Sequence, residues 1–384
     1  MTGTTGRAYD ADHEAFREVV RDLLAKEVVP HFAEWESAGL VPKEIFARLG
    51  ELGIPGMQVP EEYGGGGATS FRFSAVLTEE VVRAGVHLGG LGVHMNVVLP
   101  YLLRYATEEQ RRRWLPGIAR GELMTAIAMT EPGTGSDLAG MTTRARRAGD
   151  RFVLDGAKTF ITGGINCDLV LVVARTGNSE NRRQGLSLLV VEDGMPGFTR
   201  GLKLDKLGLH TQDTAELFFD GVEVPEDNLL GEEGQAFTYL TGNLPQERLA
   251  IALGAVAAAE TALDTTVGYV KEREVFGSSL AGFQNTRFEL AACGAEVMAG
   301  RAMLDRSLVD HDRAELSAAD AAALKLFCTE LQGRVLDRCL QLFGGYGYIR
   351  DYPIARLYAD ARVSRIYGGT SEVMKTIIAK SLGL

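Results

Sequence analysis

The stretch MTAIAMTEPGTGSDLAG (124–140) marks the point where the residue pattern of this 384-residue chain changes. It joins a short apolar run, typical of a buried strand, to a glycine-rich turn. Further β-rich runs follow at RFVLDG, DLVLVVART, GLSLLVVE and AELFFDGVEV, each bounded by Gly, Asp or Asn. This pattern predicts a small, mostly antiparallel β domain.

Helical patterns lie on both sides of these strands. FREVVRDLLAKEVVPHFAEWE (16–36) has apolar residues at helical spacing that Pro30 interrupts, and PKEIFARLGELGI (42–54) predicts a second helix. Long Ala-rich helical stretches return after Gly231. We therefore predict an α+β multidomain chain with an N-terminal helical domain (1–121), a central antiparallel β domain (122–230) and a C-terminal four-helix bundle (231–384).

The composition argues against several classes of function. A net charge of −11 argues against a nucleic-acid partner or an anionic membrane surface, since both need clustered Lys and Arg. Four cysteines without CxxC spacing and six histidines without an HExxH pair predict no disulfide framework, no metal site and a reducing compartment. No segment reaches ~18 uninterrupted apolar residues, and Asp10, Asp12 and Glu14 stand where a leader would be apolar or basic. We expect a cytoplasmic protein without membrane insertion.

Five segments resemble the acyl-CoA dehydrogenase family, and together they run along nearly the whole chain. The resemblance implies that FAD lies between the β domain and the C-terminal bundle. It also implies an enzyme that oxidises an acyl-CoA to the trans-2-enoyl-CoA and passes the electrons to an electron-transfer flavoprotein. The segments are AMTEPGTGSDLAG (128–140), KTFITGG (158–164), LPQERLAIALG (244–254), QLFGGYGYIRDYPIAR (341–356) and RIYGGTSEVMKTII (365–378).

The position of the catalytic base narrows the type within that family. Most members carry a catalytic glutamate in the segment that reads YGGT (367–370) here, but this chain has Gly368 in its place. The long-chain and isovaleryl types carry the glutamate on an earlier helix, where this chain has Glu247. The resemblance thus implies a long-chain type with Glu247 as the base. Composition alone allows a plainer interpretation, in which a glutamate just after Pro245 partners a helix dipole or is solvated.

The resemblance also implies residues that bind the thioester. Gly368 keeps the backbone N–H that in the family donates, beside an FAD ribityl hydroxyl, to the thioester carbonyl. Because Gly368 and Gly369 have no side chains, they are expected to vacate volume beside the reacting carbons. Arg248 matches an arginine that supports the catalytic helix. The expected substrate contacts are Ser136, Arg248 and Gly369.

Two segments of the β domain are expected to line the flavin. TEPGTGSD (130–137) alone reads as a turn after a strand, and KTFITGG alone as a buried strand and a turn. The resemblance implies that Thr130 reaches the pyrimidine edge, that Phe160 covers the isoalloxazine where many members have tryptophan, and that Thr162 reaches flavin N5. The implied flavin contacts are Met129, Thr130, Gly135, Ser136 (at a phosphate), Phe160 and Thr162.

A further group of residues is expected to reach the FAD of another protomer. KEREVFGSSLAGFQ (271–284) alone reads as a helix end and a loop, with Gly277 as the stop. The resemblance implies that these residues cross a subunit interface, which requires at least a dimer and suggests a tetramer. They are Arg273, Phe276 and Gln284, with Gln341, Gly344 and Gly345 on the adenine side. Thr370 and Glu372 match family positions near the FAD diphosphate and ribose.

Two other functions compete with this interpretation. One is an oxidase or monooxygenase of the same fold, which oxygen consumption with substrate would reveal. The other is a non-catalytic acyl-CoA-binding relative. The joint presence of Glu247, Thr162 and Arg273 argues against it, because a binding protein needs no base. The sequence leaves acyl length, branching and the thioester carrier open.

Overall fold

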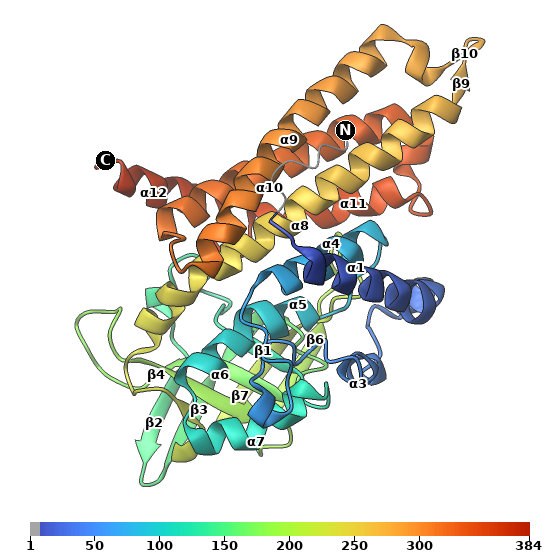
Figure 1. The fold of residues 1–384 in the computed structure, drawn as a ribbon. Helices are drawn as coiled ribbons and strands as arrows, with labels where there is room; N and C mark the ends of the chain where they lie inside the picture. Colours follow the sequence, from blue (N-terminus) through green and yellow to red (C-terminus); the bar gives the residue numbers. More distant parts are fainter. Residues whose placement is uncertain (1–7) are drawn as a thin grey trace.

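The computed structural model describes residues 8–384, in which helices come first, then a sheet, then long helices (Figure 1). Asp10 and Thr107 each form a capping box at the start of a helix. The predicted interruption at Pro30 is confirmed, since a π-turn and a 3₁₀ turn separate α1 from α2. The N-terminal helices are α1 (Ala11–Leu23), α2 (Phe32–Ala38), α3 (Glu44–Gly50), α4 (Arg72–Arg83), α5 (Leu91–Val93), α6 (Leu99–Tyr105) and α7 (Glu108–Ala119), with the π-turn η4 (His94–Val98) between α5 and α6.

The central strands form a single sheet in the order β6-β7-β3-β2-β4-β5-β8. Most neighbours pair antiparallel, as the sequence predicts, but β1 and β2 both run parallel to β4. The apolar side chains of β1, β4 and β5 are buried along most of their length because one face packs on α6 and α7 and the other face on side chains of β3 and β7. The strands are β1 (Thr125–Ala128), β2 (Arg144–Ala148), β3 (Arg151–Thr162), β4 (Leu169–Arg175), β5 (Leu186–Glu192), β6 (Phe198–Lys203), β7 (Thr214–Pro225) and β8 (Leu229–Leu230).

Three long helices dominate the C-terminal bundle, and two short helices share its fourth position. The buried alanines Ala252, Ala255, Ala259 and Ala262 recur at helical spacing along α8, so α10 can pack closely on it. The hairpin of β9 (Glu274–Val275) and β10 (Ser278–Ser279) joins α8 to α9 at the far tip of the molecule (Figure 1). The helices are α8 (Ala236–Glu272), α9 (Gln284–Asp312), α10 (Ala318–Phe343), α11 (Pro353–Ala361) and α12 (Ser371–Ser381).

Among the described residues, α8 alone is long and apolar enough to cross a membrane by length and composition. Half of its most apolar window is buried inside the protein. It packs against α4, α9 and α10, so its apolar character is explained by its place in the core of the bundle.

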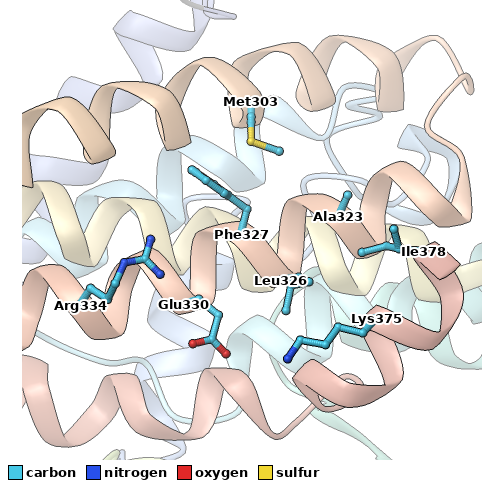
Figure 2. A pocket seen from close by; sticks show the side chains of 8 residues that line it. All are labelled: Met303, Ala323, Leu326, Phe327, Glu330, Arg334, Lys375 and Ile378. Atoms are coloured by element: carbon cyan, nitrogen blue, oxygen red, sulfur yellow. The ribbon is translucent and has the colours of Figure 1, made fainter.

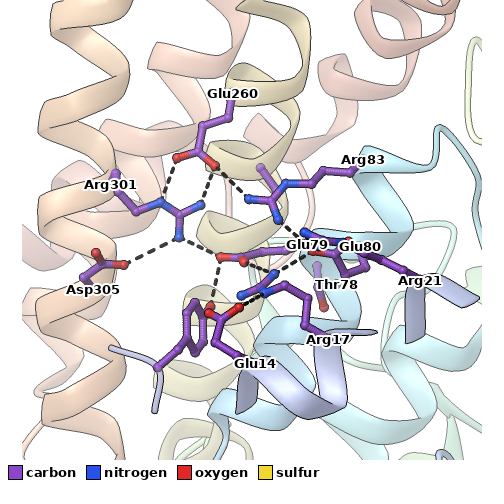
Figure 3. A network of polar contacts seen from close by, with 12 residues as sticks. Glu14, Arg17, Arg21, Thr78, Glu79, Glu80, Arg83, Glu260, Arg301 and Asp305 are labelled. Atoms are coloured by element: carbon purple, nitrogen blue, oxygen red, sulfur yellow. Dashed lines mark hydrogen bonds and ion pairs between the residues drawn. The ribbon is translucent and has the colours of Figure 1, made fainter. Parts of the chain in front are cut away.

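A buried ionic network ties the N-terminal helices to the bundle (Figure 3). Glu79 of α4 accepts hydrogen bonds from Tyr9 Oη at 2.9 Å, Arg17 Nη1 at 2.9 Å and Arg301 Nη1 at 2.7 Å. Arg301 of α9 also binds both carboxylate oxygens of Glu260 on α8, at 2.8 and 2.6 Å. Burial would raise the pKa of Glu79, but Arg301 and Arg17 hold it below its usual value. The network therefore joins α1, α4, α8 and α9 through charged groups.

Candidate active site

Glu247 is a buried carboxyl group on the first half of α8, with only 6% of its surface exposed. Tyr101 Oη donates to its Oε1 at 3.3 Å, and Asn243 Nδ2 approaches the same oxygen at 3.5 Å. Burial raises the pKa of Glu247 to about 7, against the opposing effects of these two hydrogen bonds and of the Arg248 charge. A carboxylate with this pKa can accept a proton near neutral pH.

The plainer interpretation of Glu247 as a dipole partner or solvated residue is wrong. α8 begins at Ala236, so Pro245 lies inside the helix and Glu247 is well beyond its first turn. An interior proline has no N–H to donate to the preceding turn. The side chain of Asn243, two residues earlier, donates to the Val97 carbonyl oxygen at 3.1 Å and so links this part of α8 to η4.

Gly368 faces the same stretch of α8 as Glu247. Gly368 and Gly369 have φ values of +60° and +95°, a region that other residues adopt only with strain. A Cβ atom at Gly368 would collide with Cδ1 of Ile251, which lies one helical turn after Glu247. A glutamate at position 368 is therefore disfavoured by the backbone conformation, and it would also require the end of the Ile251 side chain to move. The prediction that Gly368 vacates volume is wrong in this respect, because Ile251 fills it.

The turn that follows β1 is held by a buried carboxylate. Glu131 accepts hydrogen bonds from the backbone N–H groups of Thr142 at 2.7 Å and Thr143 at 2.9 Å, and from Lys158 Nζ at 2.9 Å. Lys158 also donates to the Met129 carbonyl oxygen at 3.0 Å. In this turn Met129 and Thr130 are half-buried, while Gly135 and Ser136 are exposed.

A β-bulge near the end of β3 presents Phe160 to the surface. The pairing of β3 with β7 shifts register between Lys158 and Ile161, and Phe160 within the shift has φ +58°. Its ring is 67% exposed, while Thr162 beyond it is half-buried. A bulky residue held in this strained conformation with an exposed apolar ring fits a site that a flat aromatic group covers.

The N-terminal helical domain packs closely against the end of β3. A Cβ atom on Gly90 would lie only 2.9 Å from Cα of Gly163, so the two backbones meet without side chains between them. The π-turn η4, four residues after Gly90, contacts both β1 and α8. The end of β3 with Thr162 and the Glu247 region of α8 thus both lie against the Gly90–Val98 segment.

The residues predicted to reach a second FAD gather at the opposite end of α8. Arg273 ends α8 and its guanidinium lies 5.5 Å from the Tyr346 ring centre, just after α10. Phe276, in the β9–β10 turn, is 98% exposed. At 1.5 Å per residue, α8 separates Arg273 from Glu247 by about 40 Å. This tip cluster comprises Arg273, Phe276, Gln284, Gln341, Gly344 and Gly345. Thr370, the N-cap of α12, and Glu372 in its first turn lie beside the Gly368 turn.

A groove on the bundle is separate from all of these sites. Figure 2 shows it between α9, α10 and α12, and none of the predicted site residues lines it. Its lining residues are Met303, Ala323, Leu326, Phe327, Glu330, Arg334, Lys375 and Ile378.

Sequence reasoning missed three residues of the Glu247 region. Tyr101 and Asn243 touch the carboxylate, and Lys325 on α10 donates to the Tyr367 carbonyl oxygen at 2.6 Å and to that of Gly369. Tyr101 carries no local signal, since it meets Glu247 only in the folded chain. Lys325 did carry one, because it is a lone charge within the apolar run AALKLF (322–327).

Comparison with known proteins covers almost the entire chain. Three family models match in order: acyl-CoA dehydrogenase, N-terminal domain, over residues 10–122; the middle domain over 126–222; and the C-terminal domain over 234–383. The long-chain specific acyl-CoA dehydrogenase, mitochondrial, of Sus scrofa is 44% identical over 98% of this chain and 87% of that protein.

Solved structures agree with these sequence matches. A crystal structure of an acyl-CoA dehydrogenase from Geobacillus kaustophilus has a TM-score of 0.97 at 47% identity, covering 99% of this chain and 100% of that one. A glutaryl-CoA dehydrogenase from Mycobacterium smegmatis in complex with FADH2 has a TM-score of 0.88 at 29% identity, covering 99% and 96% of the two chains.

Proposed function

This chain belongs to the acyl-CoA dehydrogenase family, and we propose that Glu247 is the base with which it removes the α-proton of its acyl-CoA substrate. The enzyme is FAD-dependent, as the family is. The observation that carries the proposal is a buried carboxylate on α8 beside the Gly368 turn. Anaerobic flavin bleaching with straight, branched and dicarboxylic acyl-CoAs tests the activity and ranks its substrates.

Bound FAD supplies the acceptor for the β-hydrogen and its electron pair. The residues of the chain remove the α-proton and stabilise the charge that its removal leaves on the thioester. Glu247 takes the α-proton, a C=C bond forms between the α- and β-carbons, and the acyl group loses two electrons. The Gly368 N–H donates to the thioester oxygen, which gains negative charge as the proton leaves. Arg248, itself buried, compensates the nearby carboxylate charge after Glu247 is ionised.

The pKa of Glu247 sets the expected pH dependence. Only the ionised carboxylate accepts a proton, so kcat/KM should fall about tenfold per pH unit as the pH drops below about 7. An ordinary carboxylate, with a pKa near 4.5, would keep its rate down to about pH 5. A kcat/KM that stays flat between pH 8 and 5.5, measured where FAD remains bound, contradicts the raised pKa.

The distance between the two predicted FAD regions supports a homo-oligomer. The tip cluster and the Glu247 region lie about 40 Å apart along α8, so one protomer's tip cluster does not reach the flavin beside its own Glu247. A second protomer with its tip cluster near the first one's FAD makes a dimer, and we propose a tetramer built from two such dimers. Exposed Phe276, Phe288 and Tyr348 on the bundle offer apolar surface for these contacts.

Arg273→Ala is expected to weaken FAD binding with little effect on proton removal. Loss of a charge-assisted contact to a diphosphate costs about 1.5–3 kcal/mol, which corresponds to roughly 10–150-fold in the dissociation constant. Fluorescence titration of FAD into the apoprotein measures it, and Lys271→Ala, an exposed cation on the same helix end, is the matched control. Equal FAD affinity in Arg273→Ala and wild type removes Arg273 from the cofactor site.

The electron acceptor and the compartment complete the proposal. We propose an electron-transfer flavoprotein as the acceptor, because the family resemblance implies it. Four buried free cysteines suit the reducing cytoplasm. Faster turnover with an electron-transfer flavoprotein than with oxygen supports this acceptor. Stoichiometric oxygen consumption would identify an oxidase instead.

A further inference from the structure

Lys325 is a buried cation that contacts the Gly368 turn from inside the bundle. It lies in the second turn of α10 with 1% of its surface exposed. Its Nζ donates to the carbonyl oxygens of Tyr367, at 2.6 Å, and Gly369. Burying an ammonium group is costly, so its presence here calls for a reason beyond packing.

The two carbonyl groups belong to the Tyr367–Gly368 peptide, which carries the Gly368 N–H, and to the Gly369–Thr370 peptide that follows the two glycines. The chain has no cis peptide bonds among its described residues, so the Tyr367 carbonyl and the Gly368 N–H point in opposite directions from one peptide plane. Since the Tyr367 carbonyl points at Lys325 Nζ, the Gly368 N–H points away from it. No hydrogen-bond acceptor for the Gly368 N–H is found within residues 8–384. This donor is therefore oriented and available.

The charge on Lys325 also acts through the same peptide. A cation that binds the carbonyl oxygen draws electron density through the amide, which makes the N–H at the other end a stronger donor. Burial and then the nearby positive charge of Arg248 lower the pKa of Lys325 to about 8, which leaves the ammonium group mostly protonated at pH 7. Arg248, which lies beside Glu247 in the sequence, is therefore close enough for its charge to act on both Glu247 and Lys325.

We propose that Lys325 is a positioning residue that orients and polarises the Gly368 N–H as the donor to the thioester oxygen. The inference rests on the proposed function of Glu247 and Gly368. Lys325 acts through the Tyr367–Gly368 and Gly369–Thr370 peptides, whose carbonyl oxygens it contacts. Outside this turn, Glu330 and Gln332 of α10 hold the same segment through Ser371 and Ser364.

The test measures α-proton acidity without any electron transfer. A 3-thiaacyl-CoA has sulfur in place of the β-carbon, so it has an acidic α-proton and no β-hydrogen to lose. Exchange of this proton for deuterium in D2O, followed by NMR on the FAD-loaded enzyme, reports base and carbonyl polarisation together. Lys325→Met should slow exchange by about 10–100-fold, less than loss of a whole oxyanion donor. The dissociation constant of the ligand should change by less than about threefold, since the donor acts mainly on developing charge.

Two variants separate charge from tethering. Lys325→Gln can still donate to one carbonyl but has no charge, so it should also slow exchange by about fivefold or more. Glu330→Ala loosens the segment from its outer side and should slow exchange less than Lys325→Met. Lys375→Met, an exposed lysine on α12, should exchange at the wild-type rate.

The outcomes distinguish this inference from the proposed function. If wild-type enzyme does not exchange the proton, the function proposed for Glu247 fails. If wild type exchanges and Glu247→Gln does not, but both Lys325 variants match wild type, only the role of Lys325 is wrong. If Glu330→Ala slows exchange as much as Lys325→Met, a loosened segment explains the effect and the proposal is overturned. If Lys325→Met does not bind FAD, the α-proton exchange rate of Lys325→Gln alone tests the proposal.

Discussion

Glu247→Gln is expected to slow substrate-driven flavin reduction by about 10²–10⁴-fold. Glutamine keeps the shape of the side chain and can still accept the Tyr101 hydrogen bond, but it cannot take a proton. Gly368 supplies no carboxylate as a substitute. Anaerobic stopped-flow at saturating acyl-CoA measures the rate, and calorimetry with the enoyl-CoA product should show nearly unchanged binding.

The control for this prediction lies on the same helix. Asp264→Asn removes an exposed carboxylate of α8 and should leave the reduction rate within about twofold, because surface substitutions of this kind have small effects. A reduction rate for Glu247→Gln within tenfold of wild type would mean that another group removes the proton.

Glu247→Gln should also be more stable to unfolding than wild type at alkaline pH. The pKa of Glu247 is raised from 4.5 to about 7, so ionising this group in the folded protein costs about 3 kcal/mol more than in the unfolded chain. That cost is absent below pH 4.5 and complete above pH 7. A loss of folding stability on ionisation is typical of active sites, where a group needed for chemistry lowers stability.

Glu79→Ala is expected to destabilise the protein by about 3–5 kcal/mol, because it leaves buried cations without their carboxylate. Arg17 would keep Glu80 and Glu14, and Arg301 would keep Glu260, but the ion pair that joins α9 to α4 would be lost (Figure 3). Thermal unfolding of the FAD-loaded enzyme measures the loss. Hydrogen exchange should also rise first in α1, which the network holds.

An exposed ion pair provides the comparison. Asp22→Ala breaks the exposed contact with Lys26 and should cost no more than about 1 kcal/mol. If Glu79→Ala costs no more than Asp22→Ala, the buried network does not stabilise the contact between the helical layers.

The sequence predicted the order of helices and strands because each segment carries its own periodicity. It also gave Glu247 as the candidate base, since the family resemblance links that position to the glycine at 368. It could not reveal Tyr101 or Ile251 as neighbours of this site. Those contacts join residues far apart in the chain, or depend on how α8 packs against the Gly368 turn. The same packing explains why the volume expected beside Gly368 is filled.

For the expected cofactor residues, too, the sequence predicted some features and could not predict others. Motifs gave candidate flavin segments, but they could not predict the bulge that turns Phe160 outward, because a register shift depends on the pairing of β3 with β7. They also gave no measure of the separation between Arg273 and Glu247. That separation follows from α8 being one unbroken helix, which the interior Pro245 would have argued against.

The most direct test of the central claim, that Glu247 is the base, is α-proton exchange in a bound 3-thiaacyl-CoA. In D2O at pH 8, wild-type enzyme should exchange the proton at least about 10²-fold faster than Glu247→Gln, with equal ligand affinity and no change in the flavin's oxidation state. Equal exchange rates in the two proteins would contradict the assignment, whatever the effect of the substitution on turnover.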